Sequence, residues 1–401
     1  MKSVNLSVAL VLSLVSAGSM AQEKASLDVG GLDFVPTLDV SLQHDSNVTR
    51  SNSAVISSWI SLYRPELRLE KNSDITQVSV GVSASKGIYH SSQNDNFDDY
   101  QIFVDLGFEF DRRNQLAAGF VSESGHDARG TAYSIGIGNT LLGPDKYKRT
   151  TLDTKYSYGA QTAPARFEAT VRLRNINYDN DVINGRPRDR SEQSLGGIFY
   201  YQVAPATDLV LDSRYTNTSY DSITMTDPNF VSLDSKTTNL LAGLKWESTA
   251  ATTGFAKLGY QKRSFDNDLR EGFSGLKWEA GVVWSPIERA LIEFSTANDT
   301  LETNGLGSFI KRKDYRLDWR HQWLERLSTS SAVAYGSDIY VGGLIPRQDK
   351  STQLDLTASY QFRRWISFIA AYSYIKRNSD VVDGSFDFDK NLFSLSAKLS
   401  L

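Results

Sequence analysis

The feature that most constrains this fold is an alternation of apolar and polar residues that repeats from residue 34 to the C-terminus. In one segment, for example, Leu276 and Trp278 alternate with Lys277 and Glu279. Successive side chains of a β-strand point to opposite faces, so a period of two predicts strands. The alternating segments are about ten to fourteen residues long, and none shows a helical stripe with caps. We therefore expect a chain that is nearly all β.

The connections between these segments alternate between short and long. Short ones such as Asp111–Asn114 and Ala204–Asp208 contrast with long polar ones such as His126–Lys146 and Asp221–Ser235. Eight short and nine long connections join eighteen strands. An even strand count with short periplasmic turns and long external loops is typical of an antiparallel outer-membrane β-barrel.

The strand count carries an uncertainty of two, so that sixteen strands also fit the pattern. The segment Tyr133–Gly138, inside a long connection, could hide a short hairpin or extend a strand. Both chain ends are expected on the periplasmic side. Eighteen tilted strands imply a backbone diameter of roughly 35 Å, which leaves room for an aqueous lumen, a plug, or both.

A soluble β-sandwich or propeller is the alternative, since its strands also alternate. Strands of five or six residues are usual there, whereas these match a tilted span of at least about nine to eleven residues. The last segment, Phe393–Leu401, places apolar residues on one side up to the final residue. In this it resembles the C-terminal strand that the barrel assembly machinery recognises. Aromatic residues also gather near strand ends on the apolar face, as interfacial girdles require. These are Trp59, Tyr89, Trp246, Tyr260, Trp284, Trp323, Trp365, Tyr372 and Tyr374.

The N-terminus has the layout of a secretory signal peptide. Lys2 precedes an apolar run that begins at Val8, and small residues end the segment at Ala21. The run is too short to cross a bilayer, which takes about 20 residues, although a buried helix is an alternative. The expected segments are a signal peptide over residues 1–21 with cleavage near Ala21, a short periplasmic segment over residues 22–33, and the barrel over residues 34–401.

Composition excludes several other functions. The chain has no cysteine, which removes disulfides, thiolate nucleophiles and cysteine-ligated metals. Its 43 basic and 47 acidic residues leave a net charge of −4, which argues against nucleic-acid binding. We expect no cofactor and no metal, because His44, His90 and His126 stand on alternate strands and His321 lies near a turn. No nucleophile-elbow motif occurs, and we expect no enzymatic activity.

Charged residues on the inward face are the candidate functional residues. Arginines on one wall and carboxylates on another would impose a transverse field on the lumen. The alternative is that they neutralise one another in ladders that hold the wall together. The candidate pore-lining residues are Asp39, Glu66, Arg68, Asp105, Glu109, Arg166, Arg172, Arg174, Arg316 and Arg320.

Several short stretches carry a family resemblance, which is strongest over residues 30–140. They are Phe34–Pro36, Asp45–Arg50, Trp59 with Pro65, Asn96–Tyr100 and His126–Thr131. These stretches resemble the putative β-barrel porin 2 family, whose members are outer-membrane barrels often found with exopolysaccharide or capsule systems. Taken alone, Asp45–Asn47 and Asp127–Gly130 are turn-forming segments at loop bases. The resemblance implies an exit channel for a polysaccharide and supplies no catalytic residue.

We therefore expect a non-enzymatic pore in the Gram-negative outer membrane that passes a carbohydrate polymer. The alternatives are a diffusion porin for small solutes or oligosaccharides, and a structural or adhesive barrel that acts through its loops. Expected partners are outer-membrane lipid, the transported carbohydrate or solute, the barrel assembly machinery and a periplasmic export component.

Overall fold

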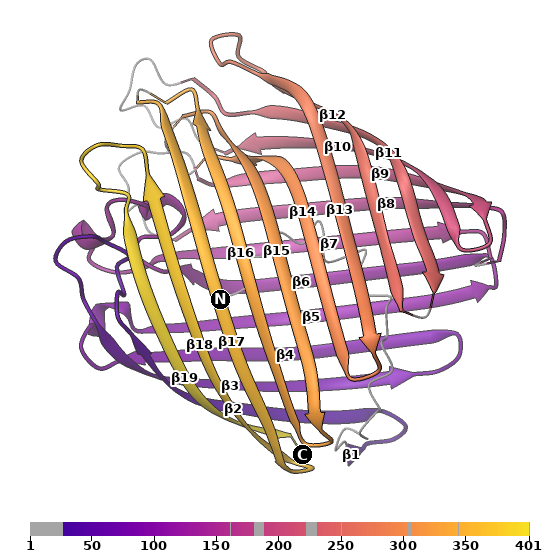
Figure 1. Ribbon diagram of the computed structural model, residues 1–401, viewed down its shortest axis with the longest axis horizontal. Helices are drawn as coiled ribbons and strands as arrows, with labels where there is room; N and C mark the ends of the chain where they lie inside the picture. The colour runs from indigo at the N-terminus through magenta and orange to yellow at the C-terminus, as the bar shows by residue number, and fades with distance from the viewer. Residues whose placement is uncertain are drawn as a thin grey trace.

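The computed structural model describes residues 27–160, 162–179, 188–221, 231–249, 251–303, 307–343 and 345–400. Across these residues the chain forms one antiparallel sheet that closes on itself (Figure 1). The predicted signal peptide over residues 1–21, its cleavage near Ala21 and the final residue Leu401 lie outside the described residues. No helix in the described part is long and apolar enough to span a membrane.

Eighteen strands, β2 to β19, form the wall, as the alternation predicted. The strands that run toward the long loops are β2 (Asp33–Asp45), β4 (Thr76–Tyr89), β6 (Asn114–Asp127), β8 (Ala165–Tyr178), β10 (Thr207–Tyr220), β12 (Thr252–Phe265), β14 (Ala290–Glu302), β16 (Leu327–Val341) and β18 (Ile366–Ser379). Those that return are β3 (Ser58–Asn72), β5 (Phe97–Asp111), β7 (Asp145–Tyr158), β9 (Arg190–Ala204), β11 (Ser235–Thr249), β13 (Phe273–Ile287), β15 (Phe309–Leu324), β17 (Arg347–Arg363) and β19 (Phe388–Ser400).

The sheet closes where β19 pairs with β2, with Leu399 opposite Leu38 and Leu395 opposite Leu42. Closure leaves the sheet without a free edge, which a bilayer interior requires because hydrocarbon forms no hydrogen bonds with backbone amides. The two-residue strand β1 (Leu27–Asp28) pairs with the start of β2. In Figure 1, β1 and the end of β19 lie together at the short-turn end, while the long loops gather at the opposite end.

The segment Tyr133–Gly138 forms neither the hairpin nor the strand extension that its sequence allowed. The loop between β6 and β7 instead contains two single turns, η2 (Ala132–Ser134) and η3 (Gly138–Thr140). Gly130 and Gly136 adopt positive φ angles on either side of η2, and such a backbone cannot continue a strand. This loop adds no strand, and the count stays at eighteen.

Apolar side chains cover the outward face of the wall, and aromatic rings mark its edges. Trp284, Trp323 and Trp365 are exposed near the short turns, and Trp59 is exposed near the long-loop end. Tyr89 departs from the predicted girdle, since it is buried in a cluster with Val48 and Ile60. It lies at an inward position of β4, where a long loop has folded over it.

The barrel bends sharply at β11 and β12, where the back wall in Figure 1 turns into the steeper front wall. Two glycines permit the close approach of these strands. A Cβ on Gly259 would lie 1.9 Å from the carbonyl oxygen of Leu240, and one on Gly243 would lie 2.0 Å from that of Ala256. Backbone atoms cannot move aside as a flexible side chain can, so the bend requires glycine here.

Substitution of Gly259 by Ala should therefore destabilise the barrel by about 2–3 kcal/mol through overpacking. Urea unfolding of the refolded barrel in detergent micelles measures this change. Gly107→Ala is the matched control, because a Cβ there would make an ordinary contact of 3.4 Å with Gln77. Equal stability of the two variants would contradict this account of the bend.

Candidate functional site

The inward face of the barrel is polar and, near the bend, densely packed. On β13, Lys277 is 1% exposed and Glu279 is 5% exposed, whereas their outward neighbour Leu276 is 57% exposed. The alternation therefore places ionised side chains inside the barrel, where they need partners.

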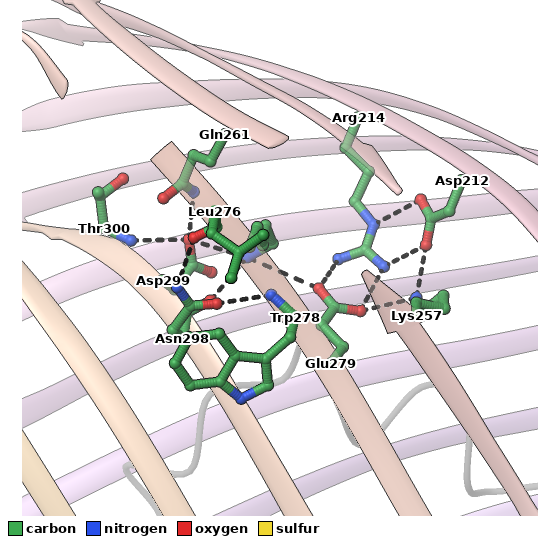
Figure 2. A network of polar contacts seen from close by, with 11 residues as sticks. Asp212, Arg214, Lys257, Gln261, Leu276, Trp278, Glu279, Asn298, Asp299 and Thr300 are labelled. Atoms are coloured by element: carbon green, nitrogen blue, oxygen red, sulfur yellow. Dashed lines mark hydrogen bonds and ion pairs between the residues drawn. The ribbon is translucent and has the colours of Figure 1, made fainter. Parts of the chain in front are cut away.

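Six charged side chains inside the bend form one connected cluster, which we call the corner network (Figure 2). Its members are Asp212 and Arg214 of β10, Lys257 of β12, Lys277 and Glu279 of β13, and Asp299 of β14. They supply three positive and three negative charges, so the cluster is formally neutral.

Glu279 lies at the centre of the corner network. Its carboxylate accepts a hydrogen bond from Arg214 at 2.8 Å and forms ion pairs with Lys257 at 2.7 Å and Lys277 at 3.7 Å. Asp212 contacts Lys257 at 2.6 Å, and Asp299 contacts Lys277 at 3.2 Å. The network ties four strands together across the lumen side of the bend.

The seam between β13 and β14 is paired by backbone only in its half nearer the short turns. Partners run from Glu279 opposite Ala297 to Ile287 opposite Ala290. Beyond this point the side chain of Asn298 bridges the seam. It accepts from the backbone N–H of Trp278 at 2.7 Å and donates to the carbonyl of Leu276 at 2.7 Å (Figure 2).

The neutralisation of Glu279 gives a direct test of the corner network. Glu279→Gln leaves Arg214, Lys257 and Lys277 with excess positive charge, so the barrel should lose about 3 kcal/mol of stability. A passage through this lumen should also become more selective for anions. Urea unfolding and the reversal potential in planar bilayers measure the two effects. Glu325→Gln, in an exposed periplasmic turn, should change neither.

A second row of ion pairs continues toward the long loops. Arg263 contacts Glu302 at 2.6 Å, and the Tyr220 hydroxyl donates to the same carboxylate at 2.7 Å. On the neighbouring wall, Glu192 pairs with Arg190 at 2.9 Å and with Arg174 at 3.2 Å.

The candidate pore-lining arginines pair with nearby carboxylates. Contacts join Arg68 to Glu66 at 2.6 Å, Arg172 to Asp153 at 2.5 Å, Arg174 to Glu192 at 3.2 Å, Arg316 to Asp318 at 2.7 Å and Arg320 to Glu293 at 4.0 Å. Arg166 pairs with Asp208, and Asp39 lies 3.8 Å from Arg64. Asp105 is exposed and Glu109 half-buried on β5. These local pairs favour neutralising ladders over oppositely charged walls.

The corner network was missed as a functional cluster by sequence reasoning, although Lys277 and Glu279 stood in an alternating segment. Its other members are on three other strands that only the folded sheet brings together: Asp212 and Arg214 on β10, Lys257 on β12 and Asp299 on β14. One signal in the sequence could have pointed to this network. Charged residues stand at inward positions of these strands, whose outward positions are mostly apolar.

Two long loops cover part of the barrel mouth, and we call residues 46–57 and 128–144 the mouth cap. Arg129 is its central contact: it is buried and donates to Asp95 at 2.8 Å, to Ser92 at 3.0 Å and to the carbonyl of Leu141 at 3.1 Å. Gly130 packs against Thr49 so closely that a Cβ would lie 2.2 Å from the Thr49 carbonyl oxygen.

The interior of the mouth cap is shielded from solvent, with Val48, Tyr133 and Leu141 all buried. Burial raises the pKa of the Tyr133 phenol and lowers the pKa of the Arg50 guanidinium. In addition, Asn139 donates to Ser51 at 2.8 Å and so links the two loops directly. Two of the stretches that resembled a family in the sequence, Asp45–Arg50 and His126–Thr131, thus meet here in space.

Arg129→Ala should loosen the mouth cap, because it leaves the buried Asp95 without its guanidinium partner. The expected result is a larger and noisier single-channel conductance in planar bilayers. Arg112→Ala, in an exposed periplasmic turn, is the control and should conduct like the native barrel. Unchanged conductance in Arg129→Ala would show that the cap does not restrict the passage.

The histidines show no shared site. The Nδ1 atom of His126 lies 2.9 Å from Asp99, the Nε2 atom of His90 lies 3.0 Å from Ser61, and the His44 ring packs on Trp59. In the described ranges no three His, Asp or Glu side chains gather in a way that could hold a metal ion.

Comparison with known proteins decides the family. The model of the family described as "Putative beta-barrel porin 2" matches residues 23–401. The chain belongs to this family. It is an outer-membrane β-barrel of porin type, and this membership implies the outer membrane of a Gram-negative cell. A search of curated proteins finds no match.

Several solved structures align with this chain at low identity. OccK3 (OpdO) of Pseudomonas aeruginosa aligns with 13% identity and a TM-score of 0.49 over 92% of this chain and 96% of that one. OpdL of the same organism aligns with 11% identity and a TM-score of 0.49 over 93% and 100%. The siderophore receptor PirA of Acinetobacter baumannii aligns with 8% identity and a TM-score of 0.49 over 92% and 80%.

Proposed function

We propose that this barrel is a non-enzymatic exit channel for an exopolysaccharide or capsular polysaccharide. The observation that carries the proposal is the lining of the inward face by guanidinium–carboxylate pairs, such as Arg172 with Asp153 and Arg316 with Asp318. Such pairs offer hydrogen-bond donors and acceptors side by side, as the hydroxyl groups of a carbohydrate require. Because the charges are neutralised locally, no single position would hold a passing chain strongly.

The proposal includes the route to the membrane and the partners. The chain would be exported by a signal peptide cut after Ala21, so that the mature barrel begins at Gln22, which N-terminal sequencing reads. The barrel assembly machinery would insert it into the outer membrane. A separate periplasmic component would deliver the polymer to the short-turn end.

A diffusion porin for small solutes or oligosaccharides is the second candidate, and the mouth cap favours it. A cap held by buried contacts such as Arg129 with Asp95 narrows the opening. A narrow passage suits small molecules, whereas a polymer would require the cap to move aside.

One pair of measurements distinguishes the two candidates. Under the export proposal, deletion of the gene should abolish polymer release into the medium, and complementation should restore it. Liposomes that contain the purified barrel should swell slowly in small sugars. Rapid swelling, together with normal polymer release from the deletion strain, would reject export in favour of the diffusion porin.

A further inference from the structure

The outward-facing basic residues near the long loops are all of one type. In the described strands, every Lys or Arg on the outward face of the half nearer the long loops is a lysine, whereas the inward face there carries arginines such as Arg174, Arg263 and Arg347 together with Lys277 and Lys390. We call eight of the outward lysines the lysine collar. They are Lys86, Lys146, Lys148, Lys236, Lys262, Lys313, Lys350 and Lys376.

The burial of their sequence neighbours confirms that these lysines point outward. Lys262 is exposed between Gln261 and Arg263, which are both almost fully buried. In the same way, Lys350 is exposed next to the buried Asp349. Since side chains alternate along a strand, an exposed lysine beside buried inward residues faces away from the lumen.

The collar lies at a constant height on the outward face. On seven strands a collar lysine stands ten residues from an outward residue near the short turns. These pairs are Lys86 with Thr76, Lys148 with Tyr158, Lys236 with Trp246, Lys262 with Thr252, Lys313 with Trp323, Lys350 with Tyr360 and Lys376 with Ile366. At about 3.3 Å per residue and a tilt of about 40°, ten residues rise about 25 Å, which is the height of the apolar band of such barrels. The ammonium groups therefore lie where the head groups of the outer leaflet begin.

Three collar lysines are bound only by exposed carboxylates. Lys86 pairs with Asp98 at 3.0 Å, Lys148 with Asp179 at 3.1 Å and Lys236 with Asp266 at 2.7 Å. All six groups are well exposed, and ion pairs of this kind are weak enough for another anion to replace them.

Lys313, Lys350 and Lys376 form an exposed group within the collar, on β15, β17 and β18. Ser337 of β16 is the register partner of both Lys313 and Lys350, so these two lysines stand two strands apart, or about 10 Å. Lys376 is opposite Thr352, two residues from Lys350. Among the described residues no carboxylate lies within 4.0 Å of any of the three, including Asp389 opposite Lys376.

We propose that the lysine collar binds the phosphate groups of lipopolysaccharide in the outer leaflet, with Lys313, Lys350 and Lys376 as the principal site. Several ammonium groups at one depth match a lipid whose head group carries more than one phosphate. Long lysine stems can lie along the apolar surface while the charged ends reach the head groups. This proposal is independent of what passes through the lumen.

The test measures lipid retained by the barrel. The native barrel is placed in phosphatidylcholine vesicles doped with bisphosphorylated lipid A and extracted in mild detergent, and the co-purified lipid A is quantified by mass spectrometry. The triple variant Lys313→Gln, Lys350→Gln and Lys376→Gln should retain at least about tenfold less, because each lysine near an anionic lipid surface contributes about 1 kcal/mol. Retention equal to that of the native barrel would overturn the proposal.

Three controls make this result specific. The triple variant Arg326→Gln, Arg363→Gln and Arg364→Gln removes the same charge from exposed turns of the same strands at the opposite end, and it should retain native levels. Replacement of Lys313, Lys350 and Lys376 by Arg should also preserve lipid A retention. This variant keeps the charge and tests whether a barrel substituted at these positions folds. A native barrel that retains dephosphorylated lipid A equally well, or that releases lipid A to millimolar inorganic phosphate, would contradict binding of phosphorylated lipid.

Discussion

The inability of hydrocarbon to hydrogen-bond the peptide backbone determines the rest of this structure. It requires a sheet without free edges, and β19 closes that sheet on β2. A closed sheet has an outward face that must be apolar and an inward face that must be polar. The inward charges then need partners of their own, and this need produces the corner network and the ladders of ion pairs.

The sequence predicts the architecture well because alternation is a local property. Strand type, the count of eighteen and the positions of turns follow from residues that are near one another in the chain. Alternation also predicts which face of each strand carries the charged residues, such as Arg172 and Arg316. The resemblance over residues 30–140 gave the family that the full-length match then showed.

Contacts between residues far apart in the sequence could not be predicted in this way. Glu279 meets Arg214, which is 65 residues away in the chain, and no periodicity encodes that contact. Tyr89 was assigned to the outward girdle because it ends an apolar segment, yet the folded loop makes it part of an inward cluster. Likewise, Arg129 stood in a turn-forming segment of the sequence, and only the packing of the mouth cap reveals its buried ion pair with Asp95.

The incomplete pairing of β13 and β14 has a mechanical consequence. A barrel unravels only when some pair of strands separates along its whole length, and separation is easiest where the fewest backbone bonds must break. On this seam the half nearer the long loops depends on Asn298 and the side chains around it rather than on a continuous backbone ladder. The wall therefore has a built-in line of least tensile strength, and lateral stress on the cylinder would concentrate there.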